Sequence, residues 1–175
     1  GALRGTVEVE GVAALNDMEA IARKGDTLYI ATSLSRNKSG RFPETRRQLV
    51  RAVADGQALR RTASIDMYGA LEAALRSDPG DAGAWLRSAA ANGSLDMEGI
   101  ALDGRGLLLG FKAPLLRGRA VILRVHDRDA LLRGAPLSAS GVSLWRAVSL
   151  ELPGSGARSG ISDLLVHGHM LHMTG

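Results

Sequence analysis

The 175-residue sequence predicts an all-β, mainly antiparallel fold: part of a β-propeller of four-stranded blades with one helical hairpin inserted. The first observation behind this prediction is an internal repeat. Asp17–Ala22 returns as Asp96–Ala101 with a single change, from Ala20 to Gly99. A third, degenerate copy begins at Ile161. Repetition on this scale is typical of an array of similar structural units.

The second observation is the order of strands and turns within each repeat. In the second copy, Asp103–Gly106 separates two short apolar strands, and an Asp-Gly pair is a strong hairpin signal. Four antiparallel strands fit before the next repeat begins, and such a unit forms one propeller blade. The predicted strands of the second repeat are Glu98–Leu102, Leu107–Phe111, Arg119–Val125 and Val142–Leu150, with a loop at Lys112–Gly118; those of the first are Glu19–Ala22, Thr27–Thr32, Gln48–Val53 and Leu59–Ile65.

Helical periodicity interrupts this pattern between the two repeats. Tyr68, Leu71 and Leu75 lie at helical spacing, and the same periodicity returns from Trp85 onward. The turn-forming Ser-Asp-Pro-Gly segment at residues 77–80 separates the two runs. We therefore predict a helical hairpin over residues 66–92.

The blade boundaries predict a single propeller domain over residues 1–175, with blade repeats starting near residues 17, 96 and 161. Thr6–Val12 is expected to be a lone outer strand of a preceding blade, and the chain ends after the second strand of a new one. These blades are too few to close a ring, so we expect the domain to be truncated at both ends. Free edges at Thr6–Val12 and His169–Met173 predict self-association, or docking on the missing blades.

Composition narrows the range of functions. The chain is 45% hydrophobic and 23% charged, which is typical of a globular protein, and its Arg-rich, Lys-poor composition indicates a bacterial source. It has no cysteine, which excludes disulfides and thiolate catalysis, and no apolar run approaches the roughly 20 residues of a membrane span. The formal charge is +4, but the densest basic cluster, around Arg46 and Arg51, lacks interleaved aromatic residues. We therefore expect no membrane partner, regard nucleic acid as a poor candidate, and leave the cellular compartment open.

The repeated acidic motif predicts where a ligand would bind. The first strand of each propeller blade lines the central channel, and the loops into strand one and out of strand two open on one face. The candidate ligand-binding residues on this channel face are Asp17, Glu19, Ser33, Arg36, Asp96, Glu98, Lys112 and Asp163.

The acidic residues have two possible roles that the sequence does not separate. Clustered carboxylates can hold a hard cation such as calcium, with Glu19 and Glu98 as the candidate ligands. Alternatively, the repeated Asp accepts hydrogen bonds from backbone N–H groups and the repeated Glu pairs with Arg, which would make both structural.

A histidine group near the end of the chain is a second candidate metal site. His167, His169 and His172 have a spacing at which imidazoles can bind zinc or nickel. The repeat alignment places Gly168-His169 in a turn on the opposite face from the carboxylates, so exposed turn histidines are the alternative interpretation.

Several of these segments together resemble a known family. They are Ser94–Gly104 with Leu107–Phe111 and Lys112–Pro114, the earlier Leu28–Arg36, and the later Gly160–Leu165. In this order they are similar to the bacterial family called domain of unknown function 3616, and more distantly to phytase-like and esterase-like propellers. The resemblance implies a propeller-like fold and leaves the activity open.

Two functions follow as hypotheses. The first is a ligand-binding or interaction module that uses the channel-face carboxylates and loops to bind a small molecule or an anionic ligand. The alternative, by resemblance to phytase-like propellers, is a calcium-dependent hydrolase of phosphate or carboxylic esters. In that case Arg36 and Lys112 would stabilise an anionic substrate, and the sequence assigns no catalytic residue. Whether the protein is an enzyme is left open.

Overall fold

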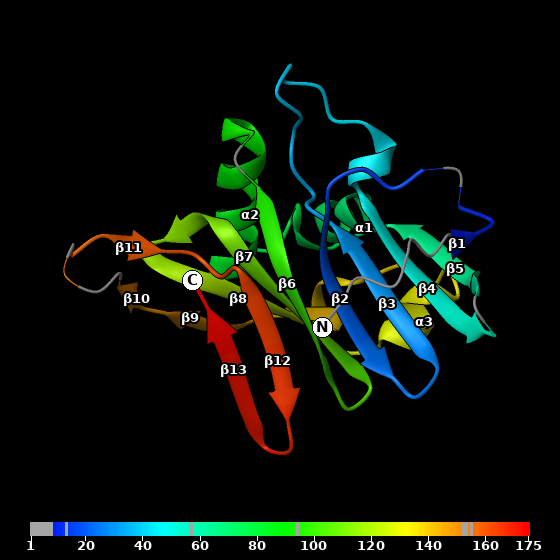
Figure 1. Cartoon of the computed structure of the whole chain (residues 1–175). Helices are drawn as coiled ribbons and strands as arrows, with labels where there is room; N and C mark the ends of the chain where they lie inside the picture. Colours follow the sequence, from blue (N-terminus) through cyan, green and yellow to red (C-terminus); the bar gives the residue numbers. More distant parts are fainter. Residues whose placement is uncertain (1–8, 13, 57, 94, 152–153, 155) are drawn as a thin grey trace.

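The computed structural model describes residues 9–12, 14–56, 58–93, 95–151, 154 and 156–175. The described chain is mainly β with antiparallel sheets, as the sequence predicts, and none of its sheets closes on itself (Figure 1). Within these residues, no helix is long and apolar enough to cross a membrane.

The first sheet contains four antiparallel strands in sequence order and a short fifth strand. Its order is β1-β5-β4-β3-β2. The lone outer strand expected at Thr6–Val12 is wrong in its described part, because Val9–Glu10 pairs in parallel with Leu59 and Arg60 of β5. Residues 6–8 lie outside the described chain. The strands are β1 (Val9–Glu10), β2 (Met18–Lys24), β3 (Thr27–Thr32), β4 (Gln48–Asp55) and β5 (Ala58–Asp66).

The second sheet is a four-stranded antiparallel meander in the order β6-β7-β8-β9. Its first hairpin turns at Gly104, whose φ of +58° only glycine adopts without steric cost. The loop predicted at Lys112–Gly118 is mostly wrong, because β7 continues to Leu116 and turns at Arg117–Gly118, both with positive φ. The strands are β6 (Asp96–Asp103), β7 (Gly106–Leu116), β8 (Arg119–Val125) and β9 (Val142–Val148).

The C-terminal part of the chain forms two small two-stranded sheets. The strand predicted at Val142–Leu150 ends at Val148, and β10 (Leu150–Glu151) turns away to pair with β11 (Arg158–Ser159). The third repeat forms the hairpin of β12 (Asp163–His167) and β13 (Met170–Thr174), with Gly168-His169 in its turn as predicted.

The helical hairpin lies where the sequence predicts it, as α1 (Met67–Leu75) and α2 (Asp81–Asn92). The Asp66 carboxylate caps α1 by accepting a hydrogen bond from the Gly69 N–H, and Gly93 ends α2 in a left-handed conformation. The short α3 (Arg128–Leu132) follows β8, and two short 3₁₀ turns are η1 (Glu44–Arg46) and η2 (Ala139–Gly141).

The hairpin is part of the hydrophobic core between the two large sheets. Leu71 and Trp85 are buried in the same cluster as Leu49 of the first sheet and Phe111 of the second. The Trp85 ring packs edge-on against Phe111 with centroids 4.8 Å apart, and its indole N–H donates to the Pro114 carbonyl at 2.9 Å. The helices therefore hold the two sheets at a fixed separation.

The opening strands β2, β6 and β12 of the three repeats lie side by side (Figure 1). Glycine makes the approach of the third hairpin possible. A Cβ on Gly99 would lie 2.9 Å from Leu164 Cγ and 3.1 Å from the Leu164 nitrogen, and one on Gly110 would lie 2.7 Å from Ile161. Ala20, which replaces this glycine in the first repeat, is buried in the main core.

We expect Gly99→Ala to loosen the third hairpin. The added methyl group meets both the Leu164 side chain and its backbone, so the substitution should destabilise the protein by about 1–3 kcal/mol. Thermal unfolding measures this loss, and hydrogen exchange should show faster opening of residues 163–174. The double variant Gly99→Ala/Leu164→Ala should lose less unfolding free energy than the two single variants together. The reason is that Leu164→Ala removes the side-chain atom that the new methyl group at position 99 would meet. Strictly additive losses would contradict the proposed contact.

We also expect the purified chain to self-associate. Ile21 and Leu165 are 60% and 59% exposed, and both line an open groove of about 270 Å³ between β2, β6 and β12. The outer edge of β13 pairs with no other described strand. Light scattering over a concentration series should show dimers or larger species, and Leu165→Glu should shift them toward monomer. Ser39→Glu adds the same charge on a distant exposed loop and should leave association unchanged; a monomer at every concentration would refute the expectation.

Candidate functional site

The two copies of the acidic motif meet at one end of the opening strands. Asp17 immediately precedes β2 and Glu19 lies at its start, while Asp96 and Glu98 lie at the start of β6. We call these four carboxylates the acidic rim. The end of β3 lies between the two strands: the Ser33 N–H donates to the Asp17 carbonyl at 3.0 Å, and the Met97 N–H donates to the Ser33 carbonyl at 2.7 Å.

Two of the four rim carboxylates are paired with cations. Arg46 Nη2 lies 2.6 Å from Asp17 Oδ2, and Lys112 Nζ lies 2.7 Å from Glu98 Oε1. The Glu98 carboxylate raises the pKa of Lys112, chiefly through this hydrogen bond. Lys112 therefore lies at the predicted site, where it is paired with the rim residue Glu98.

The other two carboxylates, Glu19 and Asp96, form no ion pair with a described residue. Burial raises the pKa of Glu19, and the charges of Asp17, Glu98 and Asp96 raise it further. Burial is also the main cause of the raised pKa of Asp96, followed by the Glu98 charge, while Lys112 and Arg46 oppose the shift. Both pKa shifts have the same two causes. Burial and neighbouring negative charges each favour the protonated acid.

Arg46 also organises the loop that borders the rim. Its Nη1 donates to Ser35 Oγ at 3.0 Å and to the Arg36 carbonyl at 2.8 Å, while its other nitrogen holds Asp17. The Ser33 and Ser35 hydroxyls are 2.8 Å apart, and Ser33 is fully buried. Ser33 therefore holds the loop in shape and offers no open hydroxyl to a ligand.

Sequence reasoning missed the role of Arg46, which it placed only in a basic cluster. Arg46 ends the 3₁₀ turn η1, beyond a long loop that folds back over the start of β2. Its approach to Asp17 depends on that loop, and no local pattern indicates it.

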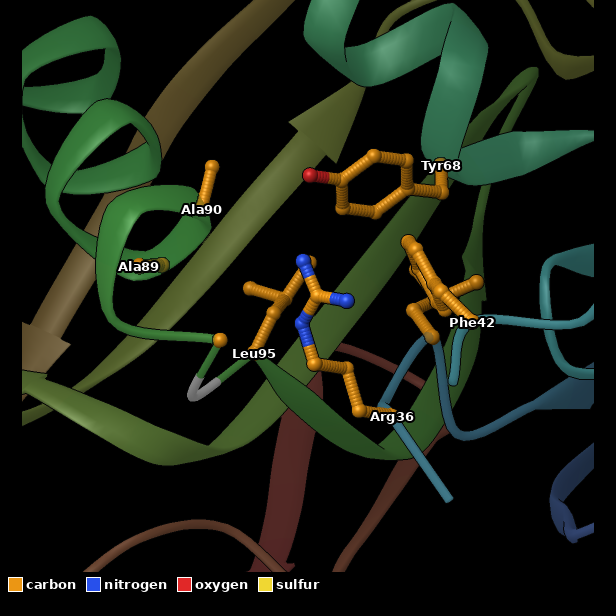
Figure 2. Close-up of a pocket in the computed structure, with 8 residues that line it drawn as sticks. Arg36, Phe42, Tyr68, Ala89, Ala90 and Leu95 are labelled. Carbon is orange, nitrogen blue, oxygen red and sulfur yellow. The ribbon is translucent and has the colours of Figure 1, made fainter. Parts of the chain in front are cut away.

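Arg36 and Asp163 form no ion pair or hydrogen bond with the rim carboxylates among the described residues, although the Asp163 backbone lies against Gly99, next to Glu98. The Asp163 side chain is exposed, accepts a hydrogen bond from the Leu164 N–H at 2.8 Å, and is absent from the charges that shift the pKa of Glu19 or Asp96. Arg36 pairs with no described carboxylate and lines a separate pocket with Phe42 and Tyr68 (Figure 2).

The structure offers no preformed metal centre within its described residues, where no three His, Asp or Glu side chains are grouped to hold an ion. His167, His169 and His172 are all exposed on the β12–β13 hairpin. Calcium binding by Glu19 and Glu98 stays a prediction.

In a comparison with protein families, the model described as Protein of unknown function (DUF3616) matches residues 29–174. The chain belongs to the DUF3616 family. No curated protein and no solved structure matches it. The DUF3616 match includes Asp96, Glu98, Lys112 and Arg46 but begins after Asp17 and Glu19, so the first acidic motif lies outside the matched region.

The pKa shift of Asp96 predicts how stability of this DUF3616 chain depends on pH. Because folding raises the pKa of this carboxyl, its favourable contribution is complete below its unfolded pKa and is lost as pH rises through the folded value. Asp96→Asn, which stays neutral, should therefore melt at a higher temperature than the parent at pH 7, and the difference should shrink toward pH 3.

The matched control for this prediction is Asp26→Asn, because the Asp26 side chain is 82% exposed. Its melting temperature should follow that of the parent at every pH. A difference for Asp96→Asn that is constant with pH, or that shrinks as pH rises, would show that folding does not raise the pKa of Asp96.

Proposed function

We propose that this protein is a ligand-binding module whose acidic rim receives a cationic group of a small molecule. One observation carries the proposal: the four rim carboxylates lie near enough for their charges to act on one another, but only Arg46 and Lys112 pair with them. Two acids, Glu19 and Asp96, are left with raised pKa values and without a cation of their own.

A bound cation would relieve this repulsion. Like charges in a partly desolvated site repel more strongly than in water, and an added positive charge converts the repulsion into attraction. The rim is also accessible, since Glu19 is exposed and Asp96 is only half-buried. Folding brings the negative charges of the rim together at a cost in repulsion. Relief of that repulsion by the bound cation would then contribute to the binding energy.

The chemistry of the rim favours an organic cation over calcium. Calcium takes about six to eight oxygen ligands, whereas Asp17 and Glu98 are already engaged with Arg46 and Lys112. An ammonium or amidinium group needs only one to three hydrogen-bond acceptors, which Glu19 and Asp96 can supply. A calcium-dependent hydrolase would require both ion pairs to open, so it is the weaker of the two hypotheses.

The arrangement of the sheets supports a propeller as the setting of this site. Both large sheets are meanders in sequence order, and the opening strands of all three repeats lie side by side (Figure 1). In a propeller such strands line the channel, and the acidic rim would then stand at one channel mouth.

Titration with n-propylammonium, followed by amide chemical shifts in NMR spectra, tests the proposal. We expect saturable shifts at residues 17–19 and 96–98, and none with n-propanol, which lacks the charge. The double variant Glu19→Gln/Asp96→Asn keeps both ion pairs and should bind at least about tenfold more weakly, since charge-assisted hydrogen bonds are lost.

The control double variant Asp26→Asn/Asp55→Asn removes two exposed carboxylates elsewhere and should bind like the parent. Equal shifts with propanol, or unchanged affinity in the rim variant, would refute the proposal. Tighter saturable binding of calcium chloride at Glu19 and Glu98, together with calcium-dependent ester hydrolysis, would instead establish the hydrolase.

A further inference from the structure

A small pocket lies between the β3–β4 loop and the helical hairpin, apart from the acidic rim (Figure 2). Three segments distant in sequence form it: the loop carrying Arg36 and Phe42, the first turn of α1 with Tyr68, and the end of α2 with Ala90 and the following Leu95. Its walls are apolar apart from two polar groups, the Arg36 guanidinium and the Tyr68 hydroxyl.

The aromatic wall of the pocket is held in place from behind. The Phe42 and Tyr68 rings meet edge to face, with centroids 4.4 Å apart at 88°. The Arg47 guanidinium lies 5.3 Å from the Phe42 centroid and 5.5 Å from that of Tyr68, and it is paired with Asp66, the cap of α1. Arg47 is thus paired with a carboxylate of its own, and it contacts the two aromatic rings of the pocket wall.

The Arg36 guanidinium is a cation without a carboxylate partner in the described chain. Its Nη1 donates to the Gly40 carbonyl at 3.0 Å, and it lies 5.8 Å from the centre of the Phe42 ring. Gly93 leaves room for its side chain, because a Cβ there would lie 2.8 Å from Arg36 Nε. Arg36 is exposed to solvent, and Nη1 is the only one of its side-chain nitrogens that forms a hydrogen bond among the described residues, so further guanidinium N–H groups are free to donate to a ligand.

The Tyr68 hydroxyl is a second donor facing the same space. Figure 2 shows the hydroxyl and the Arg36 guanidinium directed into the gap beside Ala90 and Leu95, and the hydroxyl bonds to no described residue. Burial and the Glu72 charge raise the pKa of Tyr68, with Arg36 opposing, so this group carries its proton at neutral pH.

We propose that Arg36 and Tyr68 form a binding subsite for the oxyanion of a small carboxylate or phosphate ester with a flat apolar body. The pocket has about 10 Å³ of free space, enough for one water-sized group, so it takes a single oxygen of the ligand. A guanidinium with a hydroxyl donor matches an oxyanion, while Phe42 and Ala90, which are only partly buried, offer an apolar surface to the ligand body outside the pocket.

The subsite does not depend on the function proposed for the acidic rim. Its two donors belong to different side chains from the rim acids and call for the opposite ligand charge. The Glu19→Gln/Asp96→Asn variant should therefore bind an anionic probe as the parent does, so that either proposal can fail alone.

Titrations with benzoate, phenyl phosphate and the neutral benzamide, followed by amide chemical shifts, test the subsite. We expect saturable shifts near residues 36, 68 and 95 with at least one of the anions and none with benzamide; the stronger anion identifies the head group. Arg36→Met should weaken binding at least about tenfold, and Tyr68→Phe, which removes only the hydroxyl, about two- to tenfold. Lys38→Met removes an exposed cation from the same loop and should change nothing.

Thermal melts confirm that each variant folds. If Arg36→Met does not fold, Arg36→Lys and Tyr68→Phe decide: the lysine keeps the charge but loses the planar fork, so both should bind benzoate or phenyl phosphate more weakly than the parent. Equal binding of benzamide, parent-like affinity in the folded variants, or the absence of saturable shifts with both anions would overturn the proposal.

Discussion

The close packing of the opening strands β2 and β6 is the constraint on which the rest of the structure depends. Because the repeats align in space, the same acidic motif arrives twice at one place, and backbone hydrogen bonds through Ser33 lock the two copies together. The alignment of the repeats that these backbone hydrogen bonds stabilise therefore also concentrates negative charge on the acidic rim. The fold offsets part of it with two cations from other segments, Arg46 and Lys112, and leaves Glu19 and Asp96 uncompensated.

The same packing constraint explains where the repeats diverge. Gly99 and Gly110 have no room for a side chain because Leu164 and Ile161 of the third repeat press against them. Ala20 occupies the corresponding place in the first motif and contributes its methyl group to the core. The change from Ala20 to Gly99 between the two motifs thus matches the close approach of the third repeat to the second.

The β3–β4 loop links the two polar features of the molecule. Arg46 bonds to Asp17 on the acidic rim and to the backbone carbonyl of Arg36, whose side chain lines the aromatic pocket. One side of the loop therefore faces the carboxylates of the acidic rim. The other side carries the Arg36 guanidinium, which has no carboxylate partner in the described chain. The helical hairpin completes this arrangement, because it fills the core between the sheets and also supplies Tyr68 and Ala90 to the pocket wall.

The sequence by itself determined the features that arise from local patterns. The strands at Thr27–Thr32 and Arg119–Val125, the turn at Gly104 and the helical hairpin all follow from residue alternation, helical spacing and turn chemistry, and the structure has them in place. The repeat also predicted that the two acidic motifs would lie near one another, and the charges of Asp17, Asp96 and Glu98 all act on Glu19. Membership of the DUF3616 family followed from the motifs in their order.

Only the tertiary structure decided which groups face those motifs. The extension of β7 to Leu116 and the parallel pairing of Val9–Glu10 with β5 depend on neighbours that no short segment contains. Arg46 reaches Asp17, and Arg36 turns to Tyr68 instead of the acids, because a long loop folds back over the first sheet. Charge pairing and pocket shape depend on contacts between segments that are distant in the sequence. The residue pattern therefore identifies candidate functional residues, but only the tertiary structure shows which side chains they contact.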